Sequence, residues 1–145
     1  MDLNNYEFNT LLKGIIDNPK ALRMKKFIQH GNVSTYNHCL KVAWKVFIIN
    51  RKFNLKLDEK ILVKAAFLHD YFLYDWHDHN DSLHGYHHAK IAKQNARRDF
   101  AISSKEASII ESHMWPLNLT KIPKSREAWL LCIVDKMVSL DETLR

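Results

Sequence analysis

The stretch AAFLHDYFLYDW, residues 65–76, places a histidine and an aspartate side by side at the end of an apolar run. Asp58 offers an N-cap, and the apolar stripe that follows it predicts an amphipathic helix running directly into His69 and Asp70. Burying two ionisable groups is costly unless they are paired, hydrogen-bonded or bound to a metal ion. The stretch therefore predicts both a core helix and a functional site at its end.

The same 3.6-residue periodicity recurs along the chain and predicts an all-α fold. We expect helices over residues 6–16, 21–29, 35–53, 58–68, 86–98, 104–113 and from 126 to near the C-terminus, with a loop over residues 114–125. Ser34 is the expected N-cap of the third helix, and Ser103 with Glu106 forms a capping box before the sixth. Glycine and proline are scarce and no strand-like alternation occurs. Residues 1–145 are thus expected to form a single domain, a bundle of about six to seven helices.

Composition narrows the class of protein. Of 145 residues, 46% are hydrophobic, which is typical of a soluble globular domain. The formal net charge of +6 favours anionic partners, but the basic residues are scattered in ones and twos, so nucleic acid is not the expected partner. No apolar run reaches the roughly 18 residues that span a bilayer, so no membrane association is expected. Cys39 and Cys132 show no CxxC spacing and no secretory leader precedes them, which predicts reduced thiols and a cytoplasmic protein.

Ionisable side chains occur on or beside the apolar faces of four predicted helices. They are His38, His69 with Asp70, His113 and Asp135. The last lies within the apolar run LLCIVDKMVSL, residues 130–140, where an unpaired carboxylate has a high desolvation cost. A metal ion would satisfy such groups. Imidazole nitrogens together with carboxylate oxygens suit Zn, Mn, Fe, Ni or Co, whereas a site made only of oxygen ligands would suit Mg or Ca better.

Five segments in order along the chain carry a resemblance to a known family. They are STYNHCLKVA (34–43), FLHDYF (67–72), HHAKIA (87–92), IIESHMWPL (109–117) and LLCIVDKM (130–137). Together they resemble the successive motifs of the HD-domain superfamily of metal-dependent phosphohydrolases, and more narrowly its small stand-alone bacterial members. The resemblance implies a helical HD-type domain and a hydrolase that acts on phosphate ester bonds.

The resemblance also implies a set of ligands for one or two divalent metal ions, with Mn, Fe, Ni, Co, Zn and Mg all open. The residues that match the ligands of the first ion are His38, His69, Asp70 and Asp135. In the branches that bind two ions, the aspartate matching Asp70 bridges to a second ion held by residues matching His88 and His113. His88 is preferred over His87 because a small residue, Ala89, follows it. His84 and His87 stay open as alternatives.

The implied reaction is cleavage of a phosphate ester of a small phosphorylated metabolite or nucleotide by metal-activated water, with Asp70 taking part in catalysis. Some relatives place an acid or a lysine three positions after this aspartate, where this chain has Leu73. Asp75 is the nearest acid and is the expected catalytic substitute. His77 and His79 from the following loop, or the metal centre alone, are the alternatives.

The segment MKKFIQHGNVSTYNH, residues 24–38, resembles a motif of the stand-alone members and predicts a substrate-side lip. Its expected substrate-binding residues are Lys25, Lys26, Gln29 and His30. The alternative is that the apolar residues between them pack while the lysines are simply solvated. Two other functions stay open, a non-catalytic module that binds metal and nucleotide and a basic nucleic-acid-binding domain. A homodimer is also open.

Overall fold

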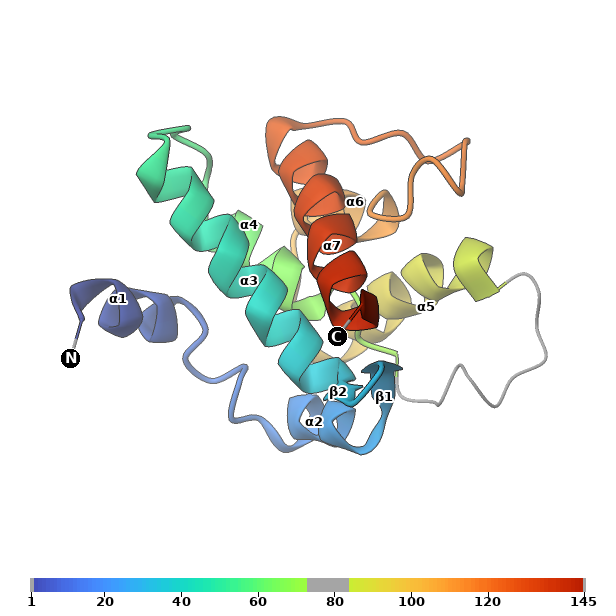
Figure 1. Ribbon diagram of the computed structural model, residues 1–145, viewed down its shortest axis with the longest axis horizontal. Helices are drawn as coiled ribbons and strands as arrows, with labels where there is room; N and C mark the ends of the chain where they lie inside the picture. Colours follow the sequence, from blue (N-terminus) through green and yellow to red (C-terminus); the bar gives the residue numbers. More distant parts are fainter. Residues whose placement is uncertain (1, 73–83, 145) are drawn as a thin grey trace.

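The computed structural model describes residues 2–72 and 84–144, and within them the chain forms helices and one short two-stranded hairpin (Figure 1). The elements in chain order are α1 (Leu3–Leu11), α2 (Pro19–Leu22), a 3-10 turn η1 (Arg23–Lys26), β1 (Ile28–His30), β2 (Val33–Ser34), α3 (Thr35–Lys52), α4 (Glu59–Leu68), α5 (His84–Asp99), α6 (Ser104–Glu111) and α7 (Arg126–Leu144). The predicted all-α class is confirmed.

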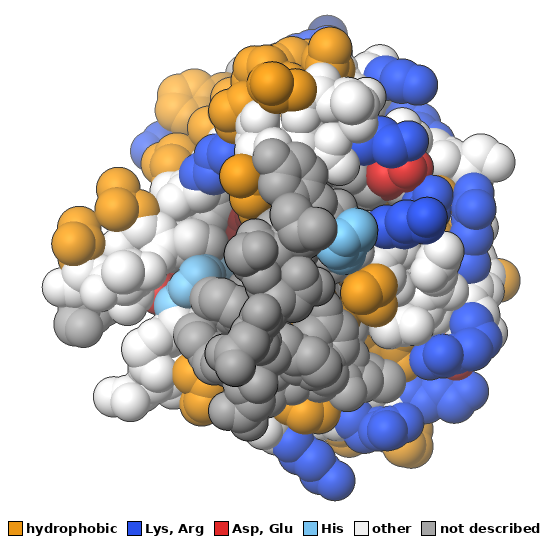
Figure 2. Space-filling view, turned by 90° about the vertical axis from the view of Figure 1, so that its right-hand side faces the viewer, with side chains coloured by type: hydrophobic (Ala, Val, Ile, Leu, Met, Phe, Trp, Pro, Cys, Tyr) orange, Lys and Arg blue, Asp and Glu red, His pale blue; other side chains and the backbone are white. Residues whose placement is uncertain are grey.

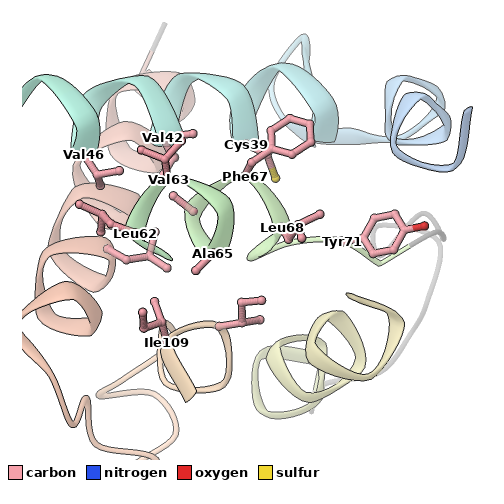
Figure 3. Close-up of a cluster of buried hydrophobic side chains, with 14 of the residues drawn as sticks. Cys39, Val42, Val46, Leu62, Val63, Ala65, Phe67, Leu68, Tyr71 and Ile109 are labelled. Atoms are coloured by element: carbon pink, nitrogen blue, oxygen red, sulfur yellow. The ribbon is translucent and has the colours of Figure 1, made fainter. Parts of the chain in front are cut away.

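Helix α4 lies at the centre of the bundle because almost every face of it is apolar. It begins where the Asp58 carboxylate accepts a hydrogen bond from the Ile61 amide at 3.2 Å, as predicted. It packs against α3, α6 and α7, and Figure 3 shows its side chains facing those of α3 on one side and Ile109 on the other. Each large apolar side chain buried this way contributes about 1.5–3 kcal/mol. The buried residues of α4 are Leu62, Val63, Ala65, Ala66, Phe67 and Leu68.

Two predicted caps begin helices that position the site. Ser34 accepts a hydrogen bond from the Asn37 amide at 3.1 Å and starts α3. Before α6, the Ser103 hydroxyl accepts from the Glu106 amide at 3.0 Å, while the Glu106 carboxylate accepts from the Ser103 amide at 2.7 Å. Both directions of the capping box are thus present.

We expect a Ser103→Ala variant to lose about 1 kcal/mol of unfolding free energy, because the Glu106 amide loses the Ser103 hydroxyl that accepts its hydrogen bond in the capping box. The measurement is chemical denaturation of the protein in the presence of a chelator. Ser104→Ala, at the exposed first position of the same helix, is the matched control and should stay close to wild type. Equal losses in both variants would contradict the role given to the cap.

The N-terminal segment differs from the sequence prediction in where its helices end. The first helix was expected to reach Ile16 but ends at Leu11. Gly14 follows with a φ of 82°, a left-handed conformation that a helix cannot include. Ile15 and Ile16 still pack against the core, so their burial was predicted correctly although their helical conformation was not.

The helix predicted over residues 21–29 was wrong in its second half. The chain instead turns through η1 and pairs β1 with β2, so that Ile28 lies opposite Ser34 and His30 opposite Val33. Gly31 makes the turn with a φ of 56°. The hairpin packs against the end of α7, and this tertiary contact stabilises a pairing that strands of three and two residues could not maintain alone.

Helix α7 closes the bundle with one face against the core and the other toward solvent. Leu131, Val134 and Val138 are buried, whereas Ile133 and Leu140 are exposed. The loop predicted over residues 114–125 lies between α6 and α7, as expected. None of the described helices combines the length and apolar character that crossing a bilayer requires.

Candidate metal centre

Six side chains from five different segments of the chain converge at the end of α4. They are the residues predicted as metal ligands: His38 of α3, His69 and Asp70 just after α4, His88 of α5, His113 just after α6 and Asp135 of α7. All six residues are buried, with exposed fractions of 7% or less. The structure therefore brings together the whole predicted set, and their binding of a metal ion stays a prediction.

The six residues form two groups that share Asp70. In the first, Nε2 of His38 and of His69 lie 2.9 and 3.1 Å from Oδ1 of Asp135. The same two nitrogens lie 3.5 and 3.2 Å from Oδ2 of Asp70. The residues of this group thus surround a common point.

The second group uses the other oxygen of the same carboxylate. Oδ1 of Asp70 lies 3.2 Å from Nε2 of His88 and 3.2 Å from Nε2 of His113, and these two nitrogens are 3.1 Å apart. This Oδ1 is buried, and in the described part of the chain these two imidazoles lie within 3.2 Å of it. A carboxylate with one oxygen in each group has the arrangement of a bridge between two cations.

Two of the histidines owe their orientation to the end of a helix. His69 and His113 each follow a helix closely, and Nδ1 of each donates a hydrogen bond of 2.6 Å to the carbonyl oxygen three residues earlier, on Ala66 and Ile110. Because a carbonyl oxygen only accepts, Nδ1 carries the proton. Nε2 of each ring can then either offer its lone pair to a cation or bind a second proton.

The donor set fits a divalent cation. Imidazole Nε2 atoms and carboxylate oxygens face one another at 2.9–3.5 Å. An ionised carboxylate can accept hydrogen bonds but cannot donate them. Among the described side chains, the donor to Asp70 besides the imidazoles is Gln29, whose Nε2 donates to Oδ2 at 2.9 Å. A cation or added protons must therefore balance this buried charge.

With no cation bound, the carboxylates attract protons onto the imidazoles. Burial lowers the pKa of His38, but hydrogen bonds with Asp135 and Glu142 outweigh burial and raise this pKa to about 10. Burial likewise lowers the pKa of His69, yet the charges of Asp70 and Asp135 raise it well above its usual range. Protons therefore occupy the first group at neutral pH.

We expect metal binding to release these protons. Since the pKa of His38 is raised from 6.5 to about 10 in the folded protein, its proton is held throughout neutral pH and is lost only as the pH rises through 10. Apparent metal affinity should then increase about tenfold per pH unit for each displaced proton between pH 6.5 and 8.5. Calorimetry in buffers of different ionisation enthalpy would count the protons. An affinity independent of pH over this range would contradict the prediction.

The predicted lip residues divide into two pairs. Gln29 is buried against Asp70, and its Oε1 accepts a hydrogen bond from the Thr35 hydroxyl at 3.3 Å. Gln29 therefore helps to hold Asp70, a predicted metal ligand, in place. His30 is half-buried, with its ring 5.6 Å from that of His38. Lys25 and Lys26 are exposed on η1, and the Lys25 ammonium lies 4.8 Å from the Tyr36 ring centroid. Substrate contacts by all four stay predictions.

Several predicted residues lie outside the described part of the chain. These are Leu73, Asp75, His77 and His79. His84 begins α5, but its side chain is not described. Of the remaining alternatives, His87 is exposed whereas His88 is buried in the second group, so the geometry favours His88.

Sequence reasoning missed Glu142, which is buried on α7. Its Oε1 lies 2.6 Å from Nδ1 of His38. The signal was available, since Glu142 follows Asp135 by seven residues, two helical turns, and therefore lies on the same face of α7. Gln29 was found, but its contact with Asp70 was not foreseen.

Comparison with protein families gives a match over most of the chain. The family model for the HD domain matches residues 35–139, which run from the start of α3 into α7 and include all six residues of the two groups. No curated protein and no solved structure matches the chain.

Proposed function

Since this chain belongs to the HD-domain family, a superfamily of metal-dependent phosphohydrolases, we propose that it hydrolyses a phosphate ester of a small phosphorylated metabolite or nucleotide. The observation that carries the proposal is the position of Asp70, whose two oxygens each face a separate group of imidazole nitrogens. Such a carboxylate suits two adjacent cations, and pairs of cations are a recurrent device for phosphoryl chemistry.

The two groups would hold the cations with different ligands. His38, His69, Asp70 and Asp135 would bind the first, and Asp70 with His88 and His113 the second. Cations at these places supply the polarisation of phosphoryl oxygens and the acidification of water that the reaction needs. Burial lowers the pKa of His113, so this imidazole is neutral and ready to act as a ligand.

The chain's own residues prepare the site before substrate arrives. Gln29 donates to Oδ2 of Asp70 and so holds the carboxylate plane, while the helix-end carbonyls hold the rings of His69 and His113. These contacts reduce the reorganisation that binding would otherwise require. Substrate phosphate would meet the residues predicted for the lip, and Asp75 is the proposed general acid.

The surface charge suits an anionic substrate. The chain has 22 lysines and arginines against 16 aspartates and glutamates. On the face of the molecule drawn in Figure 2, many lysine and arginine side chains lie on the right and histidines lie nearer the middle. A positive surface raises the rate at which phosphorylated compounds reach the site.

Turnover by metal-loaded protein tests the proposal. Chelator-treated protein would be reloaded with Mn, Fe, Ni, Co, Zn or Mg one at a time and given phosphomonoesters, phosphodiesters and nucleotides. Elemental analysis of each sample would count the bound ions. We expect phosphate release with at least one metal, and no release above that of an Asp70→Ala control in any combination would overturn the proposal.

Leu73 favours one alternative, a module that binds metal and nucleotide without catalysis, because a leucine cannot serve as the acid that some relatives carry at this position. Melting temperatures measured on the same metal-loaded samples, beside the turnover assay, separate the two functions. A nucleotide that raises the melting temperature of the metal-loaded protein and is recovered intact supports the module, whereas its hydrolysis excludes the module.

A further inference from the structure

We propose that Glu142 is a positioning residue for the metal centre, which fixes the tautomer and the ring orientation of His38 so that its Nε2 faces the first cation. The inference rests on the proposed function in one respect, that the first group binds a cation. Glu142 lies beyond residue 139, where the segment matched by the family ends, so membership of the family does not assign it a role.

The contact between the two side chains is short and dry. Oε1 of Glu142 lies 2.6 Å from Nδ1 of His38, and both side chains have an exposed fraction of 0%. An ionised carboxylate only accepts, so Nδ1 must donate. Nε2 then points to the other side of the ring, toward Oδ1 of Asp135 at 2.9 Å, and its lone pair would face the first cation once the Nε2 proton is released.

Helix α7 thus contacts the His38 ring at both nitrogens. Asp135 faces Nε2 and Glu142 faces Nδ1, and the step of seven positions from one to the other spans about 10 Å along the helix axis. The spacing leaves room for one imidazole between the two carboxylates. A ligand held at its far nitrogen by a carboxylate is both oriented and made more basic.

The opposite oxygen and the backbone of Glu142 are also held in place. Oε2 lies 3.5 Å from Nζ of Lys41, a half-exposed residue of α3, and this ion pair offsets part of the cost of burying the carboxylate. The hairpin packs onto the same turn of α7, where a Cβ added at Gly31 would meet the Glu142 carbonyl oxygen at 3.3 Å. The carboxylate therefore has little freedom to leave His38.

A third metal ion is a poorer account of the same residues. His30, His38 and Glu142 are close enough to form a possible ligand group. Yet the 2.6 Å between Nδ1 and Oε1 is shorter than the 2.9–3.5 Å between ligand atoms in the first group. Two ligand atoms on one tetrahedral cation at about 2.0–2.1 Å would be separated by about 3.3 Å.

Metal affinity without substrate is the measurement that tests the positioning role. Co²⁺ would be titrated into metal-free protein against a chromophoric chelator, with the visible Co²⁺ spectrum recorded for each variant. We expect Glu142→Ala to weaken the tighter Co²⁺ site 10–100-fold and to change its spectrum. Glu142→Gln should lose less, because its amide oxygen can still accept from Nδ1.

Glu127→Gln is the matched control, since Glu127 is another buried carboxylate of α7. It accepts from the Asp58 amide at 3.1 Å and pairs with Lys105 at 3.2 Å, so its loss should reduce thermal stability and leave Co²⁺ affinity unchanged. Glu142→Gln keeps the test valid if Glu142→Ala does not fold.

Two results would overturn the inference: wild-type Co²⁺ affinity in the folded Glu142 variants, or a Glu142→Gln loss as large as that of Glu142→Ala. Because no substrate is present, this test is separate from turnover. A wild-type protein that binds Co²⁺ and hydrolyses nothing would remove the proposed phosphohydrolase and leave the positioning role standing.

Discussion

An Asp70→Ala variant is expected to lose both metal sites and, with them, all measurable phosphohydrolase turnover. Asp70 is the one residue present in both groups, with Oδ2 facing His38 and His69 and Oδ1 facing His88 and His113. Removing a residue that hydrogen-bonds to a metal ligand typically costs 10–100-fold in metal affinity, so removing a shared ligand should cost on the order of 10³-fold or more. Elemental analysis and chelator competition, each run beside the turnover assay, would measure the loss.

The control for Asp70→Ala is Asp99→Asn. Asp99 is also a nearly buried carboxylate, but it accepts from the Tyr71 hydroxyl at 2.7 Å and pairs with Arg98, away from the two groups. It should bind metal as tightly as wild type. An Asp70→Ala protein that keeps two ions per chain would contradict the shared role of this carboxylate, whatever its activity.

The second large effect is expected on stability, from truncating Phe67 near the C-terminal end of α4. Its side chain is fully buried, and its ring packs edge-to-face on Tyr36 at a centroid distance of 5.6 Å. Phe67→Ala removes this contact and leaves a cavity that neighbouring helices fill only in part, so we expect a loss of about 3–5 kcal/mol. For a chain of this size the melting temperature should fall by roughly 10–20 °C.

Chelator must be present in that measurement, because a bound metal ion would stabilise the folded state by mass action and mask part of the loss. Phe53→Ala is the comparison, since Phe53 is 63% exposed and its truncation should change the unfolding free energy by no more than about 0.5 kcal/mol. Similar losses for the two phenylalanines would mean that α4 is not the centre of the core.

The helices that sequence predicted well are those with a strong local signal at their start. Asp58, Ser34 and the pair of Ser103 with Glu106 each cap the helix expected of them. A cap acts within three residues, so the chain's immediate neighbourhood is enough to reveal it. The hairpin at Gly31 carries no such signal, because its stability comes from the end of α7, more than a hundred residues later.

The site shows the same division between local and distant causes. Its six candidate ligands could be named from the sequence because ionisable residues in apolar helical faces are costly, and because they follow the order of a known family. The resemblance also implied their division into two groups that share Asp70, but which carboxylate oxygen faces which group could not be predicted, since it depends on distances between five separate segments. Glu142 escaped notice for a related reason, because its partner His38 lies 104 residues away.

By itself, then, the amino-acid sequence determined which faces are buried, where most helices begin and which residues can bind a cation, since periodicity, caps and desolvation act locally. The tertiary structure alone decided that one oxygen of Asp70 faces each group, that Gln29 lies behind this carboxylate and that Glu142 holds the His38 ring. These are contacts of 2.6–3.2 Å between distant parts of the chain, and only the packing of the hairpin and helices α3, α4, α5, α6 and α7 brings such atoms to hydrogen-bond distance.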